Sequence, residues 1–363
     1  MITIEKKLDL QMTYPVEHLG QMEKLLFFDI ETTGFSGDFS NLYLIGCTYF
    51  KYDSWQLIQW FADRADAEED MLHAFFMFLK NFDSLIHFNG DGFDIPYLLK
   101  RCKAYNLSYD FSGVQSIDIY RLAKPLKKLL GLENLKQKSI ERFLLIDRED
   151  QYNGGQLIEV YNEYLLSHDQ FLYSLLVLHN EDDLKGMPSI LPILFYPDFL
   201  NGCFAFERFE VSTQSDLFGT PESRLTLFYK GCCAVPVPVQ TENALCSLEL
   251  SEDSLTVTVP LFEGELKRYY ADYQNYYYLV CEDNAIHKSV GQFVDKEVKK
   301  KATAKTCYTR ISGTFLPQPV PVWEMCLKAE YKDKLTYVPF SPELFSDEEK
   351  TLSYVSAILK SFI

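Results

Sequence analysis

The chain has 363 residues, 47% of them apolar, and a formal charge of −17. This length suits about two globular domains. The negative charge argues against a protein that coats nucleic acid non-specifically. Nine scattered cysteines without a C-x-x-C spacing argue against a disulfide framework or a zinc site. No apolar run approaches the roughly 18 residues of a membrane span and the first residues lack a signal-peptide core, so we expect a cytoplasmic protein with no membrane partner.

The first strongly patterned segment is residues 25–34, LLFFDIETTG, which predicts a buried strand with two acids near its end. Residues 1–24 before it are ambiguous between an edge strand and a short helix. Side chains at i and i+2 of a strand share a face, so Asp29 and Glu31 are expected side by side, with Phe28 and Ile30 on the opposite face. Two carboxylates there are costly unless neutralised, and hard divalent cations are their usual partners. A solvated strand end is the alternative.

The following segments predict a mixed sheet with helices packed on it. Residues 41–51 and 54–61 are rich in β-branched and aromatic residues and are separated by a turn, which indicates two antiparallel strands. A helical pattern, an apolar strand and a second helix follow at 66–81, 84–88 and 93–105. Residues 116–123 read as a strand running into a helix, then come helices at 132–145, 157–167 and 169–187 and a loop at 153–155. This order predicts an α/β layered domain over residues 1–197.

From residue 198 to 363 the pattern changes to short strand-like runs broken by Pro, Gly, Asn and Asp, which predicts a second, β-rich domain. The expected strands are at 224–238, 245–259, 269–282, 305–317 and 320–331, and the expected helix is at 347–363. The lysines at 296, 299, 300, 301 and 305 indicate either phosphate contact or a solvated loop. Six tyrosines in 269–278 indicate either a stacking surface for single-stranded bases or ordinary strand packing.

Two further acidic motifs occur in the first domain. In HFNGDGFDIPYL (87–98), Asp94 begins a helix that follows a strand, so its carboxylate is directed toward the strand ends. An ordinary helix N-terminal carboxylate is the alternative. In LHNEDDL (178–184), His179 and Asp183 are four residues apart and share a helix face. A solvated acidic helix surface is the alternative here.

Taken together, FFDIETTG, HFNGDGFDIPYL and HNEDDL resemble, in this order, the three motifs of the DEDD exonuclease superfamily. The intervening residues 132–165 resemble the bacterial YprB-type predicted exonuclease branch, which carries an R-x-D-x-x-G-like stretch before a final helix. The resemblance covers approximately residues 23–195. It implies an α/β fold, namely a ribonuclease H-like mixed sheet flanked by helices, followed here by the β-rich C-terminal domain.

The resemblance also implies a set of site residues. Asp29 and Glu31 match the first-motif acids, Asp94 the second and Asp183 the third, and together they would hold two Mg²⁺ or Mn²⁺ ions. Such a pair of ions activates a water molecule and stabilises the leaving 3′ oxygen. Positions expected to lie against the substrate strand are Thr32, Thr33, Gly34 and Asn89.

His179 departs from the family pattern. Members with a Tyr carry it four residues before the last Asp, whereas members with a His use a spacing of five. A His at the Tyr-type spacing is a candidate general base, because imidazole titrates near pH 6.5; a structural His is the alternative. Asp182 leaves the register open, although the Tyr-type spacing selects Asp183. At neighbouring strand ends, Asp118 is either an auxiliary or a structural acid, and His87 is expected to be a packed strand residue.

The resulting expectation is a metal-dependent 3′–5′ exonuclease that hydrolyses phosphodiester bonds at single-stranded DNA or RNA ends. One alternative is a catalytically inactive nucleic-acid-binding or interaction protein with the same fold, which the His in the third motif and the negative charge favour. The other is a structure-specific endonuclease, which applies the same chemistry to an internal bond.

Overall fold

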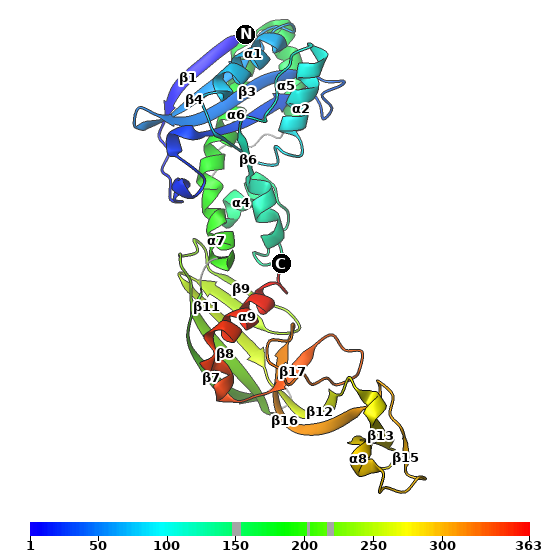
Figure 1. Cartoon of the computed structure of the whole chain (residues 1–363). Helices are drawn as coiled ribbons and strands as arrows, with labels where there is room; N and C mark the ends of the chain where they lie inside the picture. The colour runs from blue at the N-terminus through cyan, green and yellow to red at the C-terminus, as the bar shows by residue number, and fades with distance from the viewer. Residues whose placement is uncertain (147–153, 202–203, 216–220) are drawn as a thin grey trace. The chain divides into compact units, whose positions relative to one another are not determined.

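The structure is a computed structural model that describes residues 1–146, 154–201, 204–215 and 221–363. The chain divides into two compact units, Met1–Asp198 and Phe199–Ile363 (Figure 1). Within the described ranges, none of the helices combines the length and the apolar character needed to cross a membrane.

The first unit is built on one six-stranded sheet in the order β1-β4-β3-β2-β5-β6. The first four strands pair antiparallel, whereas β5 and β6 run parallel to β2. The predicted mixed sheet is therefore confirmed, and the ambiguous N-terminal segment supplies its edge strand, β1. The strands are β1 (Ile2–Leu8), β2 (Leu25–Thr32), β3 (Leu42–Lys51), β4 (Ser54–Phe61), β5 (Ser84–His87) and β6 (Gln115–Asp118).

Helices pack on this sheet because each carries an apolar face. The ring of Phe28 on β2 stacks on that of Phe75 from α1, with centroids 5.6 Å apart, and both side chains are fully buried. Burying a side chain of this kind stabilises the fold by about 1.5–3 kcal/mol. The helices of this unit are α1 (Glu68–Leu79), α2 (Asp94–Ala104), α3 (Ile119–Ala123), α4 (Gln137–Phe143), α5 (Gly154–Ser167), α6 (Gln170–Ile190) and, at its boundary, α7 (Phe195–Asn201).

Two predictions in this unit need correction. The helix expected at 132–145 is only α4, because the Asn134 side chain accepts hydrogen bonds from the Lys136 N–H and the Ser139 hydroxyl, a local turn that competes with helix. The loop expected at 153–155 is wrong at its last two positions, since α5 begins at Gly154. Residue 153 lies outside the described residues, as does the R-x-D-x-x-G-like stretch at 148–153.

The second unit is β-rich, as predicted. It contains a five-stranded sheet, β7-β8-β11-β10-β9, and two three-stranded sheets, β12-β16-β17 and β14-β13-β15. Its elements are β7 (Ala205–Ser215), β8 (Pro221–Lys230), β9 (Val239–Glu242), β10 (Ser247–Ser251), β11 (Ser254–Pro260), β12 (Phe262–Tyr269), β13 (Tyr276–Leu279), β14 (Asn284–His287), α8 (Lys288–Gly291), β15 (Lys299–Lys301), β16 (Tyr308–Gln318), β17 (Thr336–Pro339) and α9 (Glu348–Leu359).

The strand expected at 320–331 is wrong. Only isolated bridges form there, at Leu327 and Lys328. Pro319 and Pro321 flank the start of this segment and have no N–H to donate to a ladder, so a continuous strand does not form.

Parts of the lysine and tyrosine runs of the second unit lie on one small sheet, where β15 (Lys299–Lys301) pairs with β13 (Tyr276–Leu279). Lys299 is anchored, because its Nζ donates to the carbonyls of Gly291 and Val294, each at 2.6 Å. Part of the tyrosine run is used for packing, since the Tyr276 ring stacks on Tyr270 with centroids 5.0 Å apart. The lysines at 296, 300, 301 and 305 are exposed, and their contact with phosphate stays a prediction.

Candidate functional site

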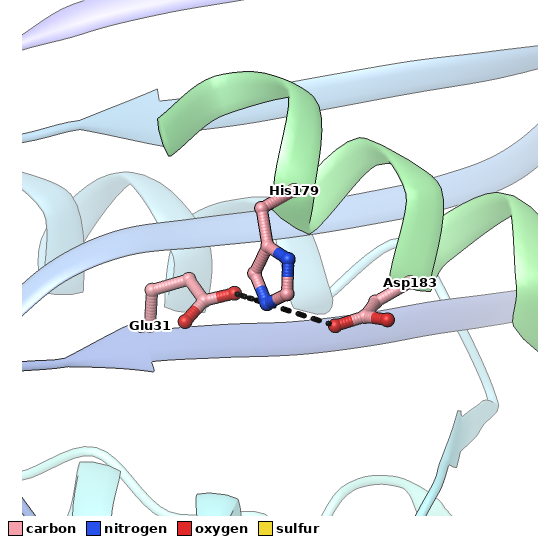
Figure 2. Close-up of side chains that lie close together, drawn as sticks. All are labelled: Glu31, His179 and Asp183. Atoms are coloured by element: carbon pink, nitrogen blue, oxygen red, sulfur yellow. Dashed lines mark ion pairs between the residues drawn. The ribbon is translucent and has the colours of Figure 1, made fainter. Parts of the chain in front are cut away.

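The predicted acids of β2 face helix α6. Phe28 and Ile30 are buried in the core on the opposite face of the strand, as the strand alternation requires. His179 on α6 points between two carboxylates, with Nε2 3.6 Å from Glu31 Oε1 and 3.5 Å from Asp183 Oδ2 (Figure 2). Glu31 and His179 are both buried, whereas Asp183 is about a quarter exposed. One helix and one strand thus bring the first and third motifs into contact.

The second motif reaches the same place through backbone hydrogen bonds. Strand β5 pairs with β2 only as far as Phe27 and Ile86, so Ile30 lies beyond this pairing. The carboxylate of Asp94, at the start of α2, accepts hydrogen bonds from the Ile30 N–H and from its own N–H. Burial raises the pKa of Asp94 to about 7, although these two hydrogen bonds lower it. Asp94 is therefore held against β2 in a setting that disfavours its ionised form.

Asp29 is influenced by the charges of the other three acids in the group. Burial raises the pKa of the Asp29 carboxyl well above its ordinary value, and the charges of Glu31, Asp94 and Asp183 raise it further. The hydrogen bond from Asn180 acts in the opposite direction. The structure therefore brings all four predicted acids together. The charge of Asp183 on α6 contributes to this rise, and the choice of Asp183 over Asp182 as a metal ligand stays a prediction.

A row of side chains across the sheet orients Asp29. Strand register aligns Asp29 with Gly46 on β3, and Gly46 with Gln59 on β4. Asn180 of α6 lies over Gly46 and donates from Nδ2 to Asp29 Oδ2 at 2.8 Å, while Gln59 Nε2 donates to Asn180 Oδ1 at 2.9 Å. A Cβ at Gly46 would stand 2.0 Å from Asn180 Oδ1. Glycine is required here by close approach of the helix.

None of the three residues that support Asp29 was predicted from the sequence. Asn180 stands inside the third motif, beside His179, and that position was its only signal. Gly46 and Gln59 had no local signal, because their role depends on the pairing of β3 and β4 with β2.

The predicted substrate-binding residues occupy two turns. Thr32 Oγ1 donates to the Gly34 carbonyl at 2.8 Å, and the Asn41 N–H donates to Thr33 Oγ1 at 2.8 Å, so these side chains close the turn after β2. Asn89 is exposed and has a positive φ of 64°, a conformation that Asn adopts more readily than most residues. Its N–H donates to Asp118 Oδ1 at 2.8 Å.

The remaining predicted side chains form a second polar group at the ends of β5 and β6. Asp118 accepts hydrogen bonds from the Tyr120 and Arg121 N–H groups and so caps α3. His87 is buried, accepts from the Gly90 N–H at 3.0 Å and contacts the Ser116 hydroxyl at 2.8 Å. The contacts of His87 are those expected of a packed His, and the role of Asp118 as an auxiliary or a structural acid stays a prediction.

The donor set of the main site fits a divalent cation. Four neighbouring carboxylates concentrate negative charge, and their charges add to burial in raising the pKa of Asp29. Oxygen ligands of this kind suit Mg²⁺ and Mn²⁺. Ligand atoms of Glu31, His179 and Asp183 all lie within 4.8 Å of one another, a separation that one ion can span.

Comparison with known proteins agrees with the motif resemblance. Residues 26–194 match the family model described as the RNase_H superfamily, which supports the superfamily but does not distinguish the YprB-type branch. The chain is 36% identical over 89 residues to the DNA polymerases of Thermococcus litoralis and Thermococcus aggregans. That alignment covers 22% of this chain and 5% of each polymerase, so the chain matches only about a twentieth of these relatives' length.

Solved structures give weak global matches. The family B DNA polymerase of Pyrobaculum calidifontis matches with a TM-score of 0.39 and 12% identity, over 69% of this chain and 35% of the polymerase. E. coli exonuclease I in complex with an oligonucleotide matches with a TM-score of 0.28 and 11% identity, over 58% of this chain and 55% of exonuclease I. A product-bound exonuclease I matches with a TM-score of 0.29 and 12% identity, over 94% of this chain and 72% of that exonuclease I. Nothing about activity follows from TM-scores below 0.5.

Proposed function

We propose that this chain is a nuclease of the RNase H superfamily, and specifically a metal-dependent 3′–5′ exonuclease that acts on single-stranded DNA or RNA ends. The observation that carries the proposal is the convergence of Asp29, Glu31, Asp94 and Asp183 from one strand and two helices. The family match over residues 26–194 supports the same reaction class.

The four acids are the proposed ligands of two Mg²⁺ or Mn²⁺ ions. When bound, such ions activate water and neutralise charge on the leaving oxygen. The protein's part is to hold the ligands in place: the Ile30 N–H fixes Asp94, and Asn180 fixes Asp29. Preorganised ligands of this kind cost little reorganisation when substrate binds. Thr32, Thr33, Gly34 and Asn89 remain the proposed contacts to the substrate strand.

His179 is the proposed general base. Its Nε2 lies between the carboxylates of Glu31 and Asp183, which hold the ring in one orientation beside the proposed metal ligands. A carboxylate that orients a histidine in this way is a recurring arrangement in acid–base catalysis. The same position would also allow His179 to be a metal ligand. Loss of a ligand would lower the affinity for metal, whereas loss of a general base would not.

The test is hydrolysis of 5′-labelled and 3′-labelled single-stranded oligonucleotides with Mg²⁺ or Mn²⁺. We expect stepwise shortening from the 3′ end by the wild type and none by Asp29→Asn, which keeps the shape of the side chain. Absence of hydrolysis with either metal would leave an inactive nucleic-acid-binding protein. Internal cuts would assign the chain as an endonuclease instead.

A second experiment addresses His179. If it is the general base, His179→Gln should lower kcat by about 100-fold or more and leave the metal concentration for half-maximal activity unchanged. A ligand role predicts instead that this metal concentration rises. A near-normal rate at all metal concentrations would make His179 structural.

A further inference from the structure

A cavity of about 530 Å³ with a mixed polar and apolar lining lies in the first unit, a volume within the range of small-molecule sites. Three separate segments form its walls: the end of β5, the α3 region and the segment that leads into α4. The lining residues are Phe88, Asn89, Tyr120, Lys127, Asn134, Leu135, Lys136 and Gln137.

The cavity adjoins the elements that carry two of the proposed metal ligands. Gln137 Nε2 donates to the main-chain carbonyl of Asp183 at 3.1 Å, so one wall is bonded directly to α6. On another wall, the Asn89 N–H donates to Asp118, and the charge of Asp118 raises the pKa of Asp94. A ligand in this cavity would lie beside Gln137, which contacts the backbone of the proposed ligand Asp183.

The charge of the lining opposes that of the rest of the chain. Residues 121–138 contain six basic residues and one acidic residue, in a chain whose formal charge is −17. Lys127 and Lys136 are both exposed. In the part of the chain that the structure describes, neither makes an ion pair. Their charge is therefore available to an anion.

The remaining lining suits a nucleotide. The rings of Phe88 and Tyr120 meet edge to face, with centroids 6.0 Å apart, and Asn89, Asn134 and Gln137 add amide groups that donate and accept hydrogen bonds. Aromatic rings beside cationic groups are the usual composition of single-strand binding grooves. A small free anion would need only Lys127 and Lys136, whereas a nucleotide can also use the aromatic and amide side chains of this lining.

We infer that this cavity binds the phosphodiester backbone of the single-stranded nucleic acid whose end reaches the acidic site, with Lys127 and Lys136 as its phosphate contacts. The inference rests on the proposed function for the position of the strand end. It adds a substrate-binding subsite and two residues outside the three motifs. Their role is to bind the strand, so their loss should weaken binding rather than slow the bond-breaking step.

The experiment measures binding of a fluorescein-labelled single-stranded oligonucleotide by anisotropy, in EDTA and over a series of salt concentrations. Each lost phosphate contact should reduce the slope of log K against log salt by about 0.7. We expect the double variant Lys127→Gln/Lys136→Gln to show a slope smaller by about 1.4. The control Lys7→Gln/Lys103→Gln removes the same charge at exposed positions away from the cavity lining and should keep the wild-type slope.

Equal slopes in the two double variants would overturn the inference, as would a wild-type protein that does not bind the oligonucleotide. Displacement by inorganic phosphate as effectively as by unlabelled oligonucleotide, at matched ionic strength, would also overturn it, because the cavity would then be a free-phosphate site. Binding in EDTA does not depend on hydrolysis. A chain that shows the expected slopes but cuts nothing would refute the proposed nuclease and leave the subsite standing.

Where hydrolysis is observed, its kinetics give a second readout. The cavity variant should raise KM for the oligonucleotide while kcat at saturating substrate stays near the wild-type value. A loss confined to kcat would contradict a role in binding the strand.

Discussion

Asn180 on α6 and Asp29 on β2 are joined by a hydrogen bond of 2.8 Å from Nδ2 to Oδ2, although 151 residues separate them in the chain. The Asn180 side chain is fully buried and its other amide atom, Oδ1, accepts from Gln59. A buried amide satisfied on both sides fixes the orientation of its neighbours. Asp29 is therefore held by tertiary contacts in addition to its own strand.

Asn180→Ala should destabilise the protein and impair metal binding. The change leaves an Asp29 oxygen without its Asn180 donor and removes one of the two acceptors of Gln59 Nε2, which keeps the Val177 carbonyl. The expected cost is about 1–3 kcal/mol, measured by urea unfolding. The metal concentration for half-maximal activity should rise, because Asp29 loses its orientation. The control is Asn81→Ala, which removes an exposed side-chain hydrogen bond to Phe78 and should change stability by less than about 0.5 kcal/mol. Equal effects of the two changes would contradict an orienting role for Asn180.

Gly46→Ala tests the close approach of α6 to β3. The new Cβ would stand 2.0 Å from Asn180 Oδ1 and 2.5 Å from Leu184 Cδ1, so the helix or the amide must move. We expect a loss of about 1–3 kcal/mol and reduced hydrolysis. At Gly113 a Cβ meets nothing within 4 Å, and Gly113→Ala should be nearly neutral in both assays. A neutral Gly46→Ala would show that Asn180 can be displaced without consequence.

Asp94→Asn should change how stability depends on pH when metal is absent. The pKa of Asp94 is raised to about 7 in the folded protein, above its ordinary value, so folding favours the protonated form. Its contribution to stability is complete below about pH 4 and is lost as pH rises through about 7. Asn mimics the protonated acid and can accept the same two N–H groups.

The measurement is thermal unfolding in EDTA between pH 4 and pH 8. The variant and the wild type should unfold at similar temperatures at pH 4, and the variant should be the more stable at pH 8, by a difference on the order of 4 kcal/mol. The exposed Asp110, whose pKa is lowered by its hydrogen bonds with Ser112, provides the control Asp110→Asn, which should show no such gain at pH 8. Parallel pH curves for Asp94→Asn and the wild type would contradict the raised pKa.

Divalent metal should stabilise the folded chain. A ligand present at 100 times its dissociation constant adds about 2.7 kcal/mol to the free energy of unfolding, so Mn²⁺ should raise the unfolding temperature of the wild type. Asp183→Asn removes a proposed ligand and should abolish most of this increase. Asp70→Asn, which alters an exposed acid paired with Arg64, should retain it. An increase that is the same in all three proteins would place the metal elsewhere.

The order of elements in the first unit could be predicted because it depends on local patterns. The alternation in LLFFDIETTG buries Phe28 opposite Asp29, and the helical spacing of His179 and Asp183 puts both on one face. Prediction failed where a side chain competes with the backbone, as Asn134 does before α4. It also failed at 320–331, where Pro319 and Pro321 flank the start of a segment without a strand.

By itself, the sequence determined which residue types are available for the site, namely three acidic motifs in a definite order along the chain. Only the tertiary structure decided how those motifs meet. The register across β2, β3 and β4 aligns Asp29 with Gly46 and Gln59, and Asn180 then bridges them. No local pattern encodes such a row, because pairing between strands is set by the packing of the whole sheet.

The same distinction applies to LLFFDIETTG itself. Its spacing placed Asp29 and Glu31 on one face, which is a property of any strand. The contact of Glu31 with His179, the hydrogen bond between Asp94 and the Ile30 N–H, and the raised pKa of Asp29 all require α2 and α6 to pack against that strand. The physical reason is that burial and neighbouring charges, which set the properties of these acids, exist only once the chain is folded.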